Sequence, residues 1–171
     1  MKINVVLVEP EIPQNTGNIA RTCAATGSKL HLIHPLGFKI SEKEVKRAGL
    51  DYWDKVDIEE HDSLDAFLQK YPANKNNMFF LTTKGQKCYS DINFREMNSD
   101  IFILFGKETK GLPEDLLINN LSHAIRIPMK KDLRSLNLSN SVSIVLYEIL
   151  RQRNFDNLEE ISVYLNTKYD I

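Results

Sequence analysis

Apolar residues along this chain fall into short runs, and polar stretches with helix-start and helix-stop residues separate them. Runs rich in β-branched and aromatic residues predict buried strands at residues 3–8, 30–33, 56–58, 78–82, 101–105 and 124–127. The stretches between them predict helices at about residues 15–26, 41–49, 62–71, a short one from 113, and 138–153. Because strands and helices alternate, we expect an α/β fold with a mostly parallel sheet flanked by helices.

Individual residues mark the ends of several of these helices. Asn15 or Thr16 can cap the first helix, and Gly27 can end it. Asp62 or Ser63 can cap the helix that runs to about Tyr71. Ser41 with Glu44 three residues later forms a capping box for the second helix. The last helix is amphipathic, because one of its faces carries Val142, Val145, Leu146, Ile149 and Leu150.

Composition places the chain among ordinary globular proteins. It has 171 residues, of which 42% are hydrophobic and 26% are charged. We expect a single domain over residues 1–171, with a core over about 1–155 and an acidic tail after it. The N-terminal apolar run is too short for a signal peptide, and no apolar stretch reaches the length of a membrane span. The sequence therefore predicts a soluble, cytoplasmic protein that does not contact membranes.

Cysteine and histidine spacing gives no sign of a metal site. Cys23 and Cys88 are far apart in the sequence, which favours two reduced thiols. None of the histidines forms an HxxxH or HExxH arrangement; they are His31, His34, His61 and His123. We therefore expect neither a zinc site nor another bound metal.

The charge distribution is more informative than the net charge of -1, which does not favour a general nucleic-acid binder. Basic residues crowd the last third of the chain: Lys107, Lys110, Arg126, Lys130, Lys131, Arg134, Arg151 and Arg153. The segment after Asn154 is acidic, with Asp156, Glu159 and Glu160. A local basic face is compatible with RNA binding, and it is equally compatible with an ordinary solvated surface.

The first of three polar motifs follows the first predicted strand and reads PQNTGNIAR, residues 13–21. Free amide groups at a helix N-terminus favour anions. Asn15 and Asn18 can hold a polar ligand, and Arg21 lies about one turn further along. Without other motifs, an ordinary capped helix with a surface arginine explains the segment equally well.

The second motif, GKETKGLP at residues 106–113, follows the predicted strand 101–105. It lacks the Gly-Lys-Ser/Thr ending of a Walker motif, and no GxGxxG follows the first strand, so nucleotide triphosphatases and dinucleotide-binding folds are excluded. Glu108 stands between two lysines in this glycine-bounded loop. It can hold loops together or orient a catalytic arginine, and a solvated turn is the simpler alternative.

The third motif lies between the strand 124–127 and the last helix. Five of the seven residues 135–141 are Ser or Asn. One helix cap needs one such residue, so capping does not account for the excess. Polar groups at the end of a strand, next to Arg134, indicate a binding site.

Taken together, the three motifs resemble those of the SPOUT methyltransferases. They are N-x-G-N-x-x-R at residues 15–21, F-G-x-E-x-x-G-L at 105–112, and I-P-M…S-L-N-L-S-N-S-V at 127–142. They occur in the expected order, and the similarity extends over about residues 3–153. The short chain is most similar to the members that methylate the ribose 2'-oxygen of the tRNA wobble nucleotide, cytidine or uridine.

This resemblance implies a deep trefoil knot formed by the C-terminal part of the chain, and S-adenosylmethionine as cofactor. By position, the cofactor would contact Leu81, Gly106, Ile127, Ser135 and Leu136. Leu136 stands where relatives often have Met, and Leu133 where some have a small polar residue. Both changes fall in a loop that is read mainly through its backbone, so they bear on substrate details more than on the reaction.

The resemblance also implies roles for residues around the cofactor. The catalytic set would be Arg21, Asn15, Glu108 and Asn137, with Arg21 acting on the hydroxyl as base, as electrostatic stabiliser or as phosphate ligand. The tRNA anticodon region would contact Lys110, Arg126, Lys130, Lys131 and Arg134. A homodimer would form through the first and last helices, with Ala20, Ala24 and Tyr147 at the interface. The alternatives are a ribosomal RNA ribose methyltransferase and a catalytically silent knotted RNA-binding protein.

Overall fold

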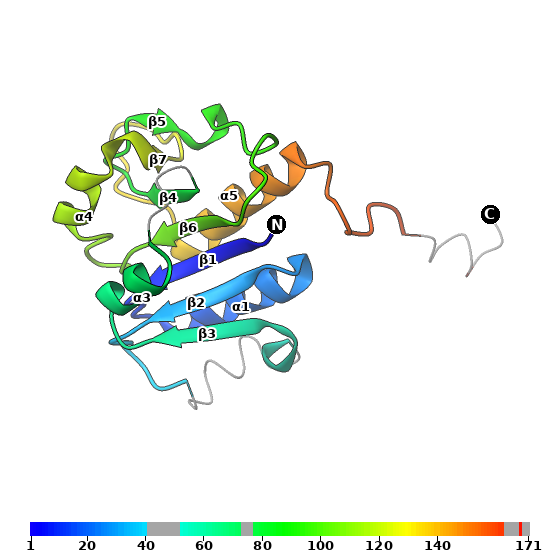
Figure 1. Cartoon of the computed structure of the whole chain (residues 1–171), viewed down its shortest axis with the longest axis horizontal. Helices are drawn as coiled ribbons and strands as arrows, with labels where there is room; N and C mark the ends of the chain where they lie inside the picture. The colour runs from blue at the N-terminus through cyan, green and yellow to red at the C-terminus, as the bar shows by residue number, and fades with distance from the viewer. Residues whose placement is uncertain (41–51, 73–76, 163–167, 169–171) are drawn as a thin grey trace.

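The computed structural model describes residues 1–40, 52–72, 77–162 and 168. Within these residues seven strands form one sheet, in the order β3-β2-β1-β6-β4-β7-β5 (Figure 1). The strands are β1 (Ile3–Val8), β2 (Lys29–Ile33), β3 (Asp57–His61), β4 (Met78–Leu81), β5 (Lys87–Cys88), β6 (Ile101–Phe105) and β7 (Ala124–Arg126). All paired strands run parallel, which confirms the predicted sheet. The helix predicted at 41–49 lies outside the described residues.

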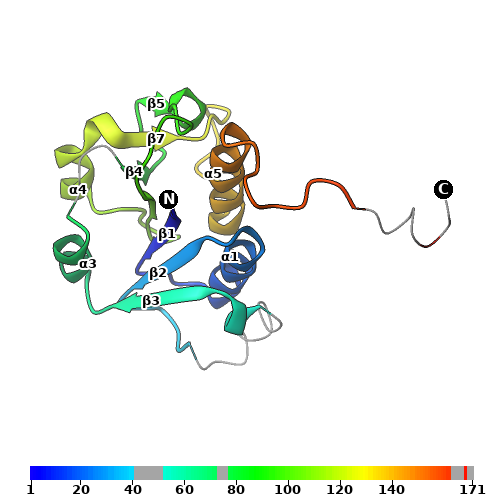
Figure 2. The same cartoon turned by 45° about the vertical axis from the view of Figure 1, so that its right-hand side comes forward.

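Helices cover both faces of the sheet (Figure 2). On one face lie α1 (Pro13–Thr26) and α5 (Leu138–Gln152), and on the other lie α3 (Leu64–Lys70) and α4 (Glu114–Asn119). Short 3-10 helices occur at Trp53–Lys55, Tyr89–Asp91 and Leu121–His123. A parallel sheet buries both of its faces, and the strands β1, β2 and β6 accordingly carry almost continuous apolar runs.

The two faces form separate hydrophobic clusters. Under α1 and α5, alternate strand residues such as Val5, Leu7 and Ile103 pack against Ile19 and Val145. Under α3 and α4, the other set of strand residues packs against Phe67 and Leu117. This alternation follows from the two-residue period of a strand, which sends successive side chains to opposite faces.

Helix ends follow the predicted signals in two of three cases. Ser63 caps α3, because its hydroxyl accepts a hydrogen bond from the amide of Ala66 at 3.1 Å. Gly27 ends α1 with φ of 67°, in the left-handed region that glycine tolerates. The predicted cap of α1 at Asn15 or Thr16 is wrong. The helix begins two residues earlier at Pro13, whose fixed φ and missing N–H suit the first helical position.

Edge strands were the hardest to predict. The strand predicted at 56–58 lies instead at Asp57–His61, and the two-residue strand β5 was not predicted. The sequence of β3, DIEEH, is mostly polar and offers little hydrophobic signal. It pairs with β2 in a register that sets Glu59 beside His31.

A buried polar group explains this polar strand. His31 and His61 are almost completely buried under α3, and His31 Nδ1 lies 3.0 Å from His61 Nε2. His31 Nε2 lies 3.1 Å from Asn4 Oδ1. Burial lowers the pKa of His31 to about 4, because the charged ring would lose its hydration, and the pKa of His61 is lowered for the same reason. Both rings are therefore neutral at pH 7.

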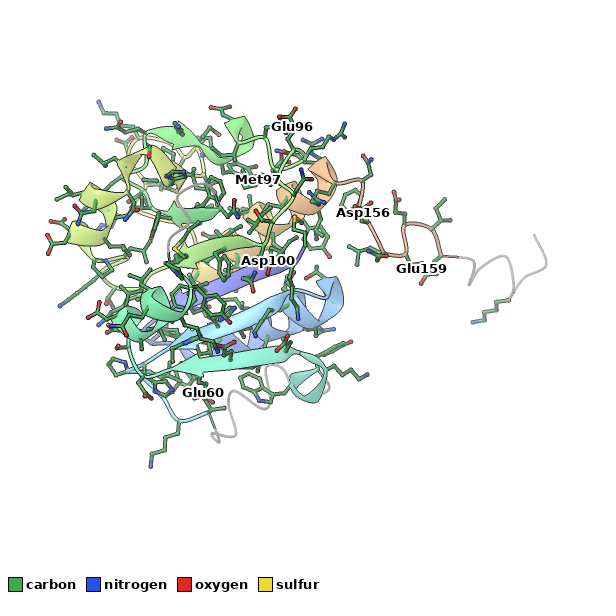
Figure 3. The ribbon with its side chains drawn as sticks, in the orientation of Figure 1. Glu60, Glu96, Met97, Asp100, Asp156 and Glu159 are labelled. Carbon is green, nitrogen blue, oxygen red and sulfur yellow. The ribbon has the colours of Figure 1, made fainter. Side chains whose placement is uncertain are left out.

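Beyond α5 the chain leaves the body of the protein, and Figure 3 shows Asp156 and Glu159 on this segment. Phe155 and Leu158 still pack partly against the core. No helix among the described residues is long and apolar enough to cross a membrane.

The buried state of His31 predicts a pH-dependent stability. Its pKa is lower in the folded chain than in the unfolded chain, so between the two values only the unfolded state takes up the proton, and stability falls as pH falls from about 6.5 towards 4. For one such group the loss between pH 7 and 5 is about 2 kcal/mol. Urea unfolding in the presence of EDTA should show this loss in the wild type and a flatter profile in His31→Gln. Equal slopes for both proteins would contradict it.

Candidate cofactor and substrate site

A cavity of about 580 Å³ opens where β4, β6 and β7 end. Ligands of parallel sheets bind at this carboxyl edge, and the volume lies within the range of small-molecule sites. The three loops that follow β4, β6 and β7 line most of the cavity, and the starts of α1 and α5 complete its wall. The second and third sequence motifs lie in these loops, so the fold brings together segments that are far apart in the chain.

All five residues predicted to contact the cofactor line this cavity, namely Leu81, Gly106, Ile127, Ser135 and Leu136. Thr82, Thr83 and Lys84 also line it and were missed by the sequence analysis. Their signal was positional, because Thr82 ends the predicted strand 78–82 and Thr83 and Lys84 follow it, at the carboxyl end that faces the site.

Gly106 leaves room for close packing of the second motif. A Cβ at this position would lie 2.0 Å from the carbonyl carbon of Gly111 and 2.1 Å from the amide nitrogen of Leu112. The loop between them is closed by a hydrogen bond from the Gly111 amide to the Lys107 carbonyl at 2.8 Å. The backbone here is therefore folded tightly on itself and exposed towards the cavity.

Glu108 links this loop to the start of α1. Its carboxylate accepts hydrogen bonds from the amides of Glu11 at 2.8 Å and Ile12 at 3.3 Å, and from Asn15 Nδ2 at 2.9 Å. Of the two functions proposed for this acid, holding loops together is the one that the described contacts support. Glu11 and Ile12 directly precede α1, so their amides make no hydrogen bond within the helix and are free to bind Glu108.

Glu11 makes the reciprocal contact. Its carboxylate accepts hydrogen bonds from the Thr109 amide at 3.0 Å and from the Thr109 hydroxyl at 2.7 Å. These two hydrogen bonds hold the pKa of Glu11 below its usual value, so the side chain stays ionised. We call the contacts of Glu11 with Thr109, and of Glu108 with Glu11, Ile12 and Asn15, the carboxylate clamp.

Asn137 joins the third motif to the clamp. Its Nδ2 donates a hydrogen bond to Asn15 Oδ1 at 3.0 Å. Its Oδ1 caps α5 by accepting from the amides of Ser139 at 2.9 Å and Asn140 at 3.3 Å. Three residues of the predicted catalytic set, Glu108, Asn15 and Asn137, thus form one continuous hydrogen-bonded chain along the cavity wall.

Arg21, the fourth residue of the set, lies elsewhere in this chain. It is exposed on α1, and its guanidinium carbon lies 5.0 Å from the centre of the Tyr52 ring. Arg21 is not among the described residues that line the cavity. An orienting contact from Glu108 to Arg21 is therefore not part of this arrangement.

The predicted RNA-binding residues lie at or near the mouth of the cavity. Lys110 and Arg134 line it. Arg126 ends β7, and Lys130 and Lys131 are exposed on the loop that follows. The positive charge therefore lies at the same edge of the sheet as the hydrogen-bonded side chains of Glu108, Asn15 and Asn137.

Comparison with known proteins identifies the family. The model of the SpoU rRNA Methylase family matches residues 2–147. This chain belongs to the SpoU rRNA methylase family. The match confirms the SPOUT resemblance that the three motifs indicated.

Individual relatives and solved structures that resemble this SpoU methylase carry more specific descriptions than the family does. A Yersinia pestis protein named tRNA (cytidine(34)-2'-O)-methyltransferase is 47% identical over 137 residues, covering 78% of this chain and 83% of that protein. A solved structure described as concerning 2-OH methylation of C/U34 on tRNA has a TM-score of 0.82 and 43% identity, covering 90% and 97% of the two chains. An AdoMet-bound rRNA methyltransferase from Sinorhizobium meliloti has a TM-score of 0.76 and 25% identity, covering 88% and 56%.

The structure corrects one of the residues predicted for a dimer of this SpoU methylase. Ala20 is completely buried in the chain's own core under α1, so its side chain has no surface left for a partner. Ala24 is partly exposed, and Tyr147 on α5 is 47% exposed. Small residues at helical spacing serve packing within a chain as well as between chains, and the sequence pattern does not separate the two.

The glycine geometry predicts different effects for two alanine substitutions in this SpoU methylase. Gly106→Ala must displace the backbone at Gly111 and Leu112, so we expect at least tenfold weaker S-adenosylmethionine binding by calorimetry. Gly111→Ala meets nothing within 4 Å but adopts φ of 72°, which costs about 1–2 kcal/mol of stability. Its affinity for S-adenosylmethionine should fall less than that of Gly106→Ala. The reverse order of affinities would refute the role of Gly106 in shaping the backbone that lines the cavity.

Proposed function

We propose that this chain transfers a methyl group from S-adenosylmethionine to the ribose 2'-hydroxyl of the wobble nucleotide of tRNA, cytidine or uridine at position 34. The observation that carries the proposal is the hydrogen-bonded chain Glu108–Asn15–Asn137 on the wall of the cavity at the carboxyl edge of the sheet. The Yersinia pestis relative and the structure concerned with C/U34 support the substrate, since both match most of this chain.

The cavity suits S-adenosylmethionine. The five residues expected to contact it all line the cavity, and the tight backbone at Gly106 offers the cradle that main-chain recognition of an adenine needs. The AdoMet-bound relative supports the same choice of cofactor. When bound, S-adenosylmethionine supplies an activated methyl carbon on its sulfonium group.

The chain's own residues have to align the ribose hydroxyl and neutralise the charge that develops on it. Asn15 and Asn137 are fixed by one another, by Glu108 and by the cap of α5, so their amides can hold the ribose with little loss of side-chain freedom. A guanidinium remains protonated in proteins. We therefore assign to Arg21 the stabilisation of the oxygen or of the neighbouring phosphate, not the removal of a proton.

The knot is part of the proposal. The last strand, β7, lies between β4 and β5 in the sheet, and the chain then returns to Asn137 beside Asn15 at the start of α1. This course favours a C-terminal segment threaded through an earlier loop, as in SPOUT methyltransferases, and a knot of this kind is a rare exception to ordinary chain topology.

We further propose a homodimer that packs through the exposed sides of α1 and α5, which lie side by side on one face of the sheet (Figure 2). Ala24 and the half-exposed Tyr147 suit such an interface, whereas Ala20 is excluded by its burial. The dimer would carry two patches of Lys110, Arg126, Lys130, Lys131 and Arg134. These patches would bind the anticodon region of tRNA in the cytoplasm, with a marked dependence on salt.

The second candidate is methylation of ribosomal RNA ribose, which the name of the matched family and the Sinorhizobium meliloti relative favour. Incubation with labelled S-adenosylmethionine and unmodified total tRNA or ribosomal RNA separates the two. We expect label in tRNA, mapped to the 2'-oxygen of nucleotide 34. Label in ribosomal RNA alone would overturn the substrate, and no label in either RNA would favour a catalytically silent RNA-binding protein.

Replacement of Arg21 tests whether its positive charge, which lies outside the cavity, contributes to methyl transfer. We expect Arg21→Ala to lower the methylation rate at least 100-fold, equivalent to about 2.7 kcal/mol, while the dissociation constant for S-adenosylmethionine changes less than twofold. Lys55→Ala is a matched control, because its ammonium lies over the same Tyr52 ring at 5.9 Å. Arg21→Ala with wild-type turnover would remove Arg21 from the reaction.

A further inference from the structure

A group of potential metal ligands lies under α3, on the sheet face opposite to α1 and α5. Asn4, His31 and Glu59 come from the adjacent strands β1, β2 and β3, and His61 ends β3. The register pairs His31 with Glu59, so their side chains share a face, and His61 follows two residues after Glu59 on that same face. Sequence spacing gave no sign of this group because its histidines come from neighbouring strands, not from one helix.

The hydrogen-bond network fixes the tautomer of His31. Asn4 Nδ2 donates to the carbonyls of Lys2 and Ile101, so Asn4 Oδ1 is the atom that faces His31 Nε2, at 3.1 Å. Nε2 must therefore carry the proton, which leaves a lone pair on Nδ1. Histidines that bind metals show this arrangement, with one ring nitrogen free and the other donating to a fixed oxygen.

The lone pair of His31 Nδ1 faces His61 Nε2, and a carboxylate oxygen of Glu59 lies close to that nitrogen. His61 Nε2 lies 3.0 Å from His31 Nδ1, and Glu59 Oε1 lies 3.3 Å from His61 Nε2. The ligand atoms of His31, Glu59 and His61 all lie within 4.8 Å of one another. Ligands about 2.0–2.1 Å from a tetrahedral zinc ion are about 3.3 Å apart. We propose that His31 Nδ1, His61 Nε2 and Glu59 Oε1 form a binding site for a divalent transition metal ion, preferably zinc.

Metal binding requires only local changes. In the metal-free chain the Nε2 proton of His61 points to His31 Nδ1, and on binding this proton moves to Nδ1 of the same ring. Lys70 Nζ lies 2.7 Å from Glu59 Oε1, and its exposed side chain can turn into solvent. Lys29 Nζ at 2.6 Å and the Tyr71 hydroxyl at 2.9 Å remain on Glu59 Oε2 and orient the carboxylate.

The carboxylates near the site are paired with lysines, so one direct negative ligand faces the ion. Glu59 contributes one negative charge as a ligand, and Asp57 lies next to it on β3, paired with Lys29 at 3.9 Å and with Lys2. The aromatic rings of Phe67, Tyr71 and Phe102 surround the histidines at 5.1–6.0 Å between ring centres. Two imidazole nitrogens with one carboxylate favour zinc over magnesium or calcium.

The proposed metal would act on stability and not on methyl transfer. The cavity at the ends of β4, β6 and β7 is lined by residues other than the proposed metal ligands. The metal would tie the polar edge strand β3 to β2. An ion that binds the folded state alone raises its stability by mass action. The inference is thus independent of the proposed function, and its test needs no RNA.

Calorimetry with Zn²⁺ on the tag-free full chain, freed of metal with EDTA, tests the site. We expect one ion per chain and a Tm that rises with Zn²⁺. His61→Ala should bind at least 100-fold more weakly, and Asn4→Ala about 10–100-fold more weakly, as is usual when a partner of a ligating histidine is removed. His34→Ala is the matched control. The partly exposed ring of His34 contacts Glu60, which lies on β3 between Glu59 and His61. This variant should bind Zn²⁺ as the wild type does.

Cobalt provides a second readout that does not depend on how well a variant folds. Co²⁺ added to the wild type should give the intense visible absorption of a four-coordinate ion with nitrogen ligands, and Zn²⁺ should displace it. Equal Zn²⁺ binding by wild type and His61→Ala, or a weak octahedral Co²⁺ spectrum in the wild type, would overturn the proposal.

Discussion

The carboxylate of Glu108 is the contact on which the arrangement of the site depends. It accepts hydrogen bonds from two amides at the start of α1 and from Asn15, while Glu11 returns the contact to Thr109. Hydrogen bonds to a charged group contribute more than those between neutral groups, about 1.5–3 kcal/mol each. The clamp therefore fixes the loops after β1 and β6 relative to one another, although they are separated by about a hundred residues.

The rest of the cavity wall is attached to this clamp. Asn15 accepts a hydrogen bond from Asn137 and so fixes that side chain as well. Asn137 both caps α5 and faces the cavity. On the other side of the loop, Gly106 allows the backbone to close on Gly111. A single rigid unit thus joins the three sequence motifs, and rigidity of this kind lowers the entropy lost when a cofactor and a ribose are aligned. Arg21 stands outside that unit, with its guanidinium over the Tyr52 ring.

The sequence predicted the central strands and the helices because their apolar periods are strong, as in β1, β6 and α5. The five residues that it predicted to contact a cofactor all line the cavity, since the motifs lie at strand ends. The sequence failed where a side chain has a distant partner. Asn15 is of a residue type that often caps helices, but its side chain donates a hydrogen bond to Glu108. Ala20 is small, as many residues at helix interfaces are, but it is buried in the core. The polar strand β3 could not be predicted from hydrophobicity, because Glu59 and His61 are satisfied by residues of β2 and α3.

The central claim, that the Glu108 carboxylate holds the site together, is tested most directly by S-adenosylmethionine binding to Glu108→Gln. The substitution keeps the size of the side chain but leaves one oxygen to face three donors. Glu60→Gln is the control, because Glu60 makes one exposed contact, with His34, at the far edge of the sheet. We expect at least tenfold weaker binding for Glu108→Gln with an unchanged circular dichroism spectrum, and wild-type binding for Glu60→Gln. Wild-type affinity in Glu108→Gln would contradict the claim.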